Sequence, residues 1–179
     1  MIAIIAEKPS VGLDIARVVG ADTRNDGYCS GNGYMVTWAL GHLVSLAMPD
    51  VYGYTKTTAE ELPMLPVPFR LVSRQIRTDR GMVTDIAATK QLKVIDSVFS
   101  KCDSIIVATD AGREGELIFR WIYAFLECTK PFCRLWISSL TDEAIRKGLE
   151  ELKDGSEYDS LYAAADSRAK ADWLVGMNA

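Results

Sequence analysis

Asp110 and Glu114 are the residues of this sequence that most directly suggest chemistry. They follow a short apolar run, residues 104–108, and share a glycine-containing acidic loop. The carboxyl ends of strands in an open parallel sheet face the ligand crevice, so we expect both side chains to project into one cleft. Carboxylate oxygens are ligands that Mg²⁺ prefers. Acidic residues also suit the start of a helix, so this loop alone leaves a metal site and a helix cap open.

A third carboxylate, Glu7, ends a second apolar run at residues 1–6, and Lys8 follows it directly. Pro9 at the next position favours the start of a helix, so the run is predicted to be a strand that leads into a helix. If this strand and the strand at residues 104–108 are neighbours in a parallel sheet, their carboxyl ends meet. The sequence then predicts that Glu7 joins the two acidic residues of the central loop.

Five segments, in order along the chain, resemble those of one enzyme family: residues 6–10 (AEKPS), 37–44 (TWALGHLV), 108–116 (ATDAGREGE), 136–141 (WISSLT) and 169–178 (AKADWLVGMN). The first and third look like the signature segments of a Toprim domain. In detail they are most similar to the topoisomerase III group of bacterial type IA DNA topoisomerases. Five segments in register are much stronger evidence than one short motif.

The resemblance implies an α/β fold of the Toprim type, a Rossmann-like and mostly parallel sheet sandwiched by helices. The alternation of predicted strands and helices suggests the same class. We expect the Toprim domain to span residues 1–155 and residues 156–179 to begin a following helical domain, with the C-terminal helix leading into a domain missing from this chain. The sequence is therefore expected to be an N-terminal fragment.

For function, the resemblance implies cleavage and religation of single-stranded DNA by a tyrosine, with Mg²⁺ as cofactor. Catalytic roles would belong to Glu7, Lys8 and Arg113. Glu7 would give a proton to the departing 3′ oxygen and remove it on resealing, and Lys8 would hold the scissile phosphate. Glu7, Asp110 and Glu114 would bind the metal, which positions the broken ends.

DNA contacts would fall to Lys8, His42, Arg113 and Arg168. His42 is the only histidine of the chain, and a lone histidine is more often a structural hydrogen-bonding residue than a functional one. For Arg168, the alternative is a residue on an exposed helix face. Both residues therefore carry a structural and a functional interpretation at this stage.

Two departures from the family pattern stand out. The usual second aspartate is replaced by Gly112, which leaves the number of metals open. None of the seven tyrosines lies in a segment that resembles the one with the nucleophile. We therefore expect the tyrosine to belong to the remaining topoisomerase domains, as partners of this chain, and the chain alone to be inactive.

The elements around these motifs follow from turn residues and apolar spacing. Residues 31–33 (Gly-Asn-Gly) predict a hairpin turn, and the prolines of residues 48–68 predict an irregular surface excursion. The spacing predicts a helix over residues 82–100 and a last helix over residues 157–175. On the last helix, Trp173 is expected to lie on an exposed face that needs a partner.

The net charge of −4 argues mildly against strong duplex binding by this chain alone. A loose basic run is expected to be a solvated face, with phosphate contact as the less favoured alternative: Arg70, Arg74, Arg77 and Arg80. No apolar run suits a membrane span or a secretory signal, so we expect a cytoplasmic protein without a membrane partner. Two other functions stay open, a Toprim nuclease or primase and a non-catalytic interaction module.

Overall fold

The computed structural model describes residues 1–54 and 58–179, and within them a seven-stranded sheet forms the centre of the molecule. Its strands are β1 (Ile2–Ala6), β2 (Thr23–Asn25), β3 (Tyr28–Gly31), β4 (Tyr34–Trp38), β9 (Ser104–Ala108), β10 (Phe132–Arg134) and β11 (Lys153–Asp154). The spatial order is β11-β10-β9-β1-β4-β3-β2. The four central strands are parallel, and the pairs at the two edges are antiparallel. The predicted α/β class with a mostly parallel sheet is confirmed.

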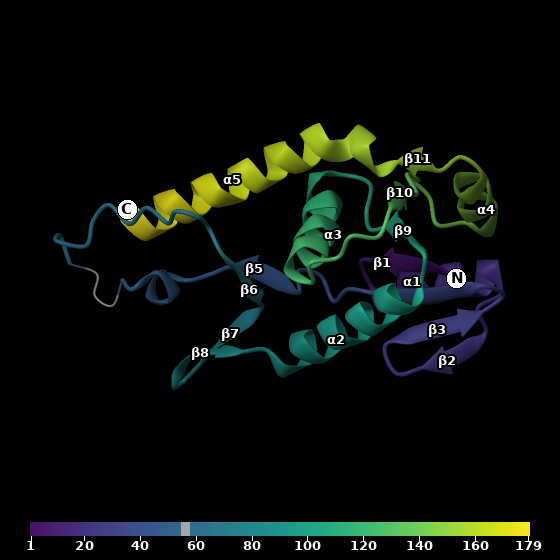
Figure 1. Cartoon of the computed structure of the whole chain (residues 1–179), viewed down its shortest axis with the longest axis horizontal. Helices are drawn as coiled ribbons and strands as arrows, with labels where there is room; N and C mark the ends of the chain where they lie inside the picture. The colour runs from purple at the N-terminus through teal and green to yellow at the C-terminus, as the bar shows by residue number, and fades with distance from the viewer. Residues whose placement is uncertain (55–57) are drawn as a thin grey trace.

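Helices cover both faces of this sheet (Figure 1). One face packs on α1 (Pro9–Val19) and α4 (Asp142–Glu150), and the other on α2 (Ile86–Lys101) and α3 (Arg113–Phe125). Successive side chains of a strand point to opposite faces, which is why the central strands are apolar throughout. Within the described residues, no helix combines the length and apolar character needed to cross a membrane.

The pairing of β1 with β9 is the feature that positions the acidic residues. The two strands are parallel neighbours, with Ile2 opposite Ser104 and Ala6 opposite Ala108. Both strands therefore end at the same level, so Glu7 and the loop after Ala108 leave the sheet side by side. The predicted pairing of these two strands is confirmed.

A smaller part of the chain lies away from the main sheet (Figure 1). Here β5 (Val44–Leu46) pairs with β6 (Leu71–Ser73), and β7 (Gln75–Thr78) pairs with β8 (Gly81–Thr84). The helix predicted from residue 82 therefore begins later, at Ile86, because residues 82–84 are part of this hairpin. Asp85 caps α2 by accepting hydrogen bonds from the backbone of Ala87 and Ala88.

The hairpin turn predicted at residues 31–33 is confirmed between β3 and β4. Asn32 and Gly33 have φ angles of 49° and 81°. Consecutive residues with positive φ form the tight turn that suits the twist of paired strands, and asparagine and glycine tolerate this conformation best.

The last helix, α5 (Asp159–Asn178), corrects one expectation from the sequence. Trp173 is only 8% exposed and needs no partner beyond this chain. Its Nε1 donates to Ala47 O at 2.9 Å, and its ring packs edge-on against Tyr52 and Phe69. The excursion predicted at residues 48–68, of which 55–57 lie outside the described residues, supplies part of this cover and also bonds to the end of α5.

Candidate active site

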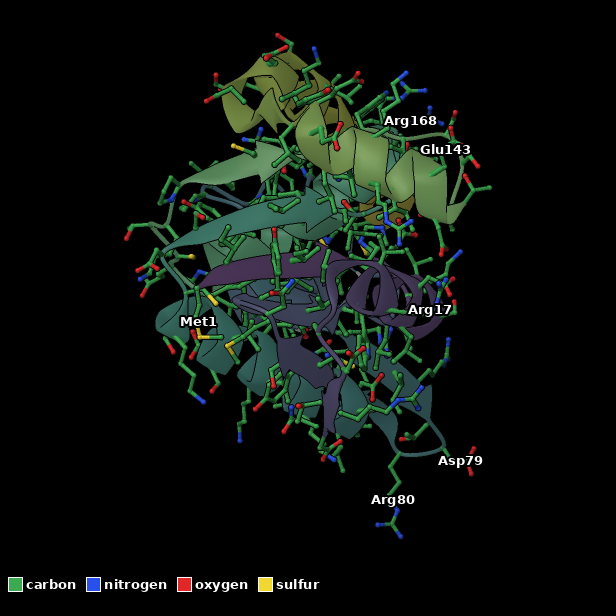
Figure 2. The ribbon with its side chains drawn as sticks, turned by 90° about the vertical axis from the view of Figure 1, so that its right-hand side faces the viewer. Met1, Arg17, Asp79, Arg80, Glu143 and Arg168 are labelled. Atoms are coloured by element: carbon green, nitrogen blue, oxygen red, sulfur yellow. The ribbon has the colours of Figure 1, made fainter. Side chains whose placement is uncertain are left out.

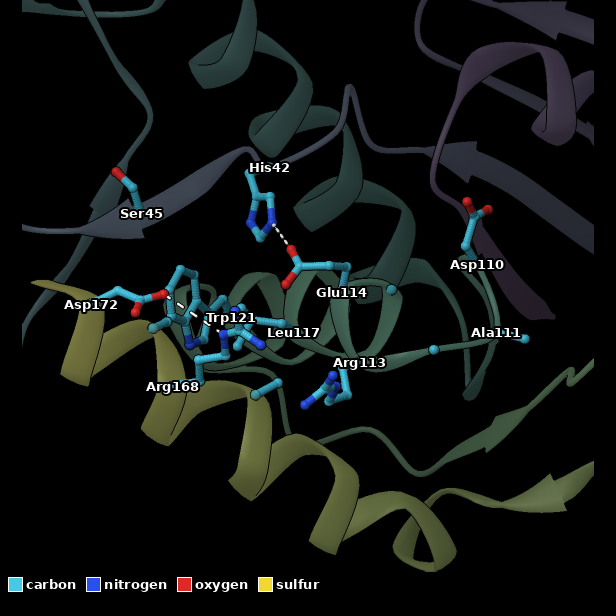
Figure 3. Close-up of a pocket in the computed structure, with 14 residues that line it drawn as sticks. His42, Ser45, Asp110, Ala111, Arg113, Glu114, Leu117, Trp121, Arg168 and Asp172 are labelled. Atoms are coloured by element: carbon cyan, nitrogen blue, oxygen red, sulfur yellow. Dashed lines mark hydrogen bonds and ion pairs between the residues drawn. The ribbon is translucent and has the colours of Figure 1, made fainter.

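A cleft of about 840 Å³ opens between the acidic loop, the start of α3 and the side of α5 (Figure 3). Its lining includes His42, Asp110, Arg113, Glu114 and Arg168. These residues come from segments far apart in the sequence, and each was predicted from the sequence to belong to the site. With Asp172, which also lines it, the cleft combines three carboxylates with two arginines and an imidazole.

Glu7 and Asp110 meet at the edge of the sheet. The backbone N–H of Asp110 donates to Glu7 Oε2 at 3.1 Å, so the two acidic residues are adjacent although 103 positions separate them. The Asp110 side chain is exposed and makes no hydrogen bond or ion pair with the residues that the structure describes. Two of the three predicted metal ligands thus lie next to each other, with Asp110 exposed and Glu7 partly exposed.

Glu114 has a different partner. Its Oε2 lies 3.0 Å from Nε2 of His42, and its side chain is 76% exposed. Figure 3 shows the Glu114 carboxylate turned toward His42, whereas the Asp110 carboxylate does not point toward Glu114. Across residues 1–54 and 58–179, no three His, Cys, Asp or Glu side chains are grouped closely enough to hold a metal. The ligand set of Glu7, Asp110 and Glu114 therefore stays a prediction.

The start of α3 explains the glycines of the acidic loop. A Cβ at Gly115 would overlap the carbonyl oxygen of Asp110, so only glycine lets the helix lie directly against the loop. The Thr109 hydroxyl ties the two together by donating to Gly115 O at 2.7 Å. The N-cap residue is Gly112, which has no side chain to cap the helix. Asp110 therefore does not cap the helix, whereas Glu114 lies in its first turn, where an acidic side chain favours a helix start.

A buried charge network supports the loop from behind. Arg134, 1% exposed, donates to Asp110 O at 2.7 Å and to the Thr109 hydroxyl at 2.9 Å. Its Nε lies 2.9 Å from Oε1 of Glu116, whose other oxygen accepts from Arg120 at 3.1 Å. Burial lowers the pKa of the Arg134 guanidinium, and the Glu116 charge opposes this shift. The network fixes the main chain that carries Asp110.

The loop that presents His42 is held in a comparable way. Arg74 donates to the carbonyl oxygens of Leu40 and His42 at 2.8 and 3.0 Å, and it forms an ion pair with Asp85 at 2.6 Å. The expectation that the basic run is a solvated face is therefore wrong for Arg74, which is partly buried and structural, whereas Arg70, Arg77 and Arg80 are exposed as expected. The His42 ring packs edge-on against Trp121.

The predicted cationic residues are arranged around the same edge. Arg113 is the first residue of α3, and Arg168 projects from α5, with Nε 3.9 Å from Oδ2 of Asp172 (Figure 3). Lys8 is exposed at the N-cap of α1, next to Glu7, and is not among the residues that line the cleft. Figure 2 shows Arg168 on the outer surface of the molecule. The DNA-binding role of these residues stays a prediction.

Sequence reasoning missed the residues that hold these groups in place: Arg74, Thr109, Gly115, Glu116 and Arg134. The available signal was weak. Arg134 lies in a short β-rich run, and a charged residue in a buried strand needs a charged partner. Glu116 is the fourth residue of a helix whose following turns are apolar. Neither pattern identifies the partner before the fold is known.

The donor set fits a magnesium ion in its chemistry. Glu7, Asp110 and Glu114 offer only carboxylate oxygens, and Mg²⁺ is usually held by one or two carboxylates together with water and phosphate oxygens. The adjacent pair of Glu7 and Asp110 meets that minimum. When bound there, the metal would supply charge neutralisation at a phosphate.

Comparison with known proteins agrees with the fold. The Toprim domain family matches residues 2–140, and the chain belongs to this family. More particularly, it is 50% identical over 180 residues to DNA topoisomerase 3 of Shouchella clausii and 50% identical over 181 residues to DNA topoisomerase 3 of Bacillus cereus. Each match covers 98% of this chain and 23% of the relative, so the chain spans under a quarter of these proteins.

A solved structure shows the same fold at lower identity. Full-length topoisomerase I from Thermotoga maritima matches with a TM-score of 0.50 and 19% identity, over 85% of this chain and 21% of that one. The resemblance to type IA topoisomerases and the Toprim fold, inferred from five short segments, is confirmed. The predicted boundary between residues 155 and 156 stays a prediction.

Proposed function

We propose that this chain holds Mg²⁺ and the scissile phosphate of single-stranded DNA, for cleavage and religation by a tyrosine in another domain of a type IA topoisomerase. The observation that carries the proposal is the meeting of Glu7 and Asp110 at the end of two parallel strands, 3.1 Å from Oε2 to the backbone nitrogen. Beside them lies a cleft that also contains Arg113 and Arg168. Carboxylates for a metal and arginines for phosphates are what phosphoryl chemistry requires.

The reaction assigns a task to each residue. The tyrosine hydroxyl loses its proton to solvent as its oxygen attacks phosphorus, the bond from phosphorus to the 3′ oxygen breaks, and Glu7 gives that oxygen a proton. Resealing reverses the transfer, since Glu7 then takes the proton back. Lys8 holds the scissile phosphate by charge, and Arg113 and Arg168 neutralise the neighbouring phosphates.

Metal binding is tested by calorimetric titration of the chain with Mn²⁺, as a substitute for Mg²⁺. Asp110→Asn should weaken binding at least about tenfold, or about 1.4 kcal/mol, because it removes an ionised ligand. The matched control is Asp172→Asn, the same substitution in the same cleft at a residue without a proposed role. Equal affinities in all three proteins would reject the proposed site.

The proposal that the nucleophilic tyrosine belongs to another domain is tested with DNA. The chain alone should not relax supercoiled plasmid in the presence of Mg²⁺, because it lacks the nucleophile. It should also leave single-stranded oligonucleotides intact. Relaxation would show that a tyrosine of this chain is the nucleophile, and metal-dependent cutting of oligonucleotides would favour a Toprim nuclease.

A further inference from the structure

We propose that His42 holds Glu114 away from the metal position in the metal-free protein, and that a divalent cation binds by taking Glu114 from His42. The imidazole is then free to donate to a DNA phosphate, so metal binding and DNA binding support each other. The inference rests on the proposed function, because it assumes that Glu114 is a metal ligand. It adds a positioning role for His42 that links the two ligands.

The contact itself has a defined direction. An ionised carboxylate can only accept hydrogen bonds, so the 3.0 Å contact between Nε2 of His42 and Oε2 of Glu114 requires a proton on Nε2. A phosphate oxygen is also only an acceptor. The same N–H can therefore serve either Glu114 or DNA, and one partner excludes the other.

The two partners differ in freedom to move. The main chain of His42 is anchored because Arg74 donates to its carbonyl oxygen at 3.0 Å, and its ring packs on Trp121 with centroids 6.0 Å apart. Glu114 lies in the first turn of α3 with a side chain that is 76% exposed, against 37% for His42. Glu114 is thus the partner that can rotate, and it can do so without disturbing the core.

The arrangement of carboxylates gives this contact a consequence for metal binding. Glu7 and Asp110 lie together, whereas the described part of the chain contains no assembled group of three ligands. A cation at this edge must therefore bind with two carboxylates or break the contact between His42 and Glu114. Exposed ion pairs contribute at most about 1 kcal/mol, so loss of this competitor should tighten metal binding by at most about fivefold.

Calorimetric titration with Mn²⁺ at one fixed pH measures this competition. His42→Ala should bind Mn²⁺ about threefold to fivefold more tightly than the unmodified chain, because Glu114 is released. His42→Gln, which keeps a hydrogen-bond donor, should give an intermediate affinity and guards against a folding defect in His42→Ala. Ser45→Ala, a substitution in the same cleft at a residue without charge, should leave the affinity unchanged.

A second readout follows from the single histidine of the chain. With isotope-labelled histidine, nuclear magnetic resonance reports His42 alone. Titration with Mg²⁺ should shift the Nε2 signal with the same midpoint as a calorimetric titration of the same protein with Mg²⁺. In Glu114→Gln, the signal should already differ in the absence of metal and should respond much less to Mg²⁺.

The outcomes separate the two proposals. If Asp110→Asn weakens Mn²⁺ binding but His42→Ala fails to tighten it, the role of His42 is overturned and the metal site stands. If the Nε2 signal does not shift while Mg²⁺ binds saturably, the role of His42 is overturned in the same way. If no protein binds metal saturably, the metal site fails and the role of His42 fails with it.

Discussion

The two sides of the acidic loop are built on opposite principles. Behind the loop, Arg134 and Glu116 are 1% exposed and are paired within the core. In front of it, Glu114 and Arg168 have side chains that are at least 70% exposed, with one weak or exchangeable contact each. The same types of charged group therefore hold the backbone on one side and face solvent on the other.

This difference shows how the chain separates positioning from binding. Of the buried pair, Arg134 donates to Asp110 O, so it fixes where the acidic loop lies without using the Asp110 carboxylate. The exposed charges have few contacts of this kind, which suits the partner exchange that we propose for metal and phosphate binding. A site of this kind needs a rigid supporting shell and side chains that remain available.

The largest effect should come from breaking the buried side. Arg134→Met should lower the free energy of unfolding by about 3–5 kcal/mol, because Glu116 loses a partner in the core. Urea denaturation measures the loss. Arg168→Met is the matched control at the exposed side and should change stability by less than about 0.5 kcal/mol. Similar losses in the two variants would remove the distinction between the two sides.

A double variant sharpens the same point. Replacing both partners, as Arg134→Met with Glu116→Leu, should recover a large part of the lost stability, because no unpaired charge then remains at their contact. Arg120, the other partner of Glu116, keeps its ion pair with Asp159. The Asp110 carbonyl still loses its donor, so Mn²⁺ binding should stay weaker than in the unmodified chain. Full recovery of metal binding would show that the network does not position the acidic loop.

A smaller effect should separate two glycines of the loop itself. Gly115→Ala should cost about 1–3 kcal/mol, because the added Cβ meets the Asp110 backbone. Gly112→Ala should cost less than about 0.5 kcal/mol, since no atom lies within 4 Å of its Cβ and its φ of 163° is extended backbone. Thermal unfolding compares the two, and an equal loss would show that the close approach of α3 is not what requires glycine.

Sequence alone predicted the exposed side of the site better than the buried side. Apolar runs that end on Glu7 and Asp110 predicted the paired strands, because strand ends and carboxylates are local features of the chain. Arg134 is 24 positions from the backbone oxygen that it holds, and nothing local indicates that pairing. Sequence reasoning could therefore predict which exposed groups lie at the acidic loop and its cleft, but not which buried groups hold them in place.

The same limit explains the errors in the fold. Residues 82–84 have apolar spacing that fits a helix, but their pairing with β7 across a tight turn decides their structure. Trp173 was expected to be exposed because its cover comes from Tyr52 and Phe69, more than 100 positions earlier. Tertiary partners of this kind override local spacing.

The smallest effect should appear at the ion pair between Arg74 and Asp85, which supports the exposed side through the His42 carbonyl. Hydrogen bonding from Arg74 lowers the pKa of Asp85 below its usual value of 3.8, against the opposing effect of burial. A carboxyl group whose pKa is lowered in the folded protein adds to the free energy of unfolding. The contribution is complete at pH values above the usual pKa, and it is lost as the pH falls through the lowered pKa. Arg74→Met should therefore be less stable than the unmodified chain near neutral pH, and the difference should shrink in acid.

Urea denaturation from about pH 6 to about pH 3 measures that difference, with Arg77→Met as the control from the exposed part of the same basic run. The control should show no pH-dependent difference from the unmodified chain. The difference in free energy of unfolding between Arg74→Met and the unmodified chain could instead stay constant down to about pH 3. Arg74 would then act through the carbonyls of Leu40 and His42 alone. In that case the ion pair would belong with the exposed, exchangeable contacts of the cleft, and the anchoring of His42 would depend on neutral hydrogen-bond acceptors.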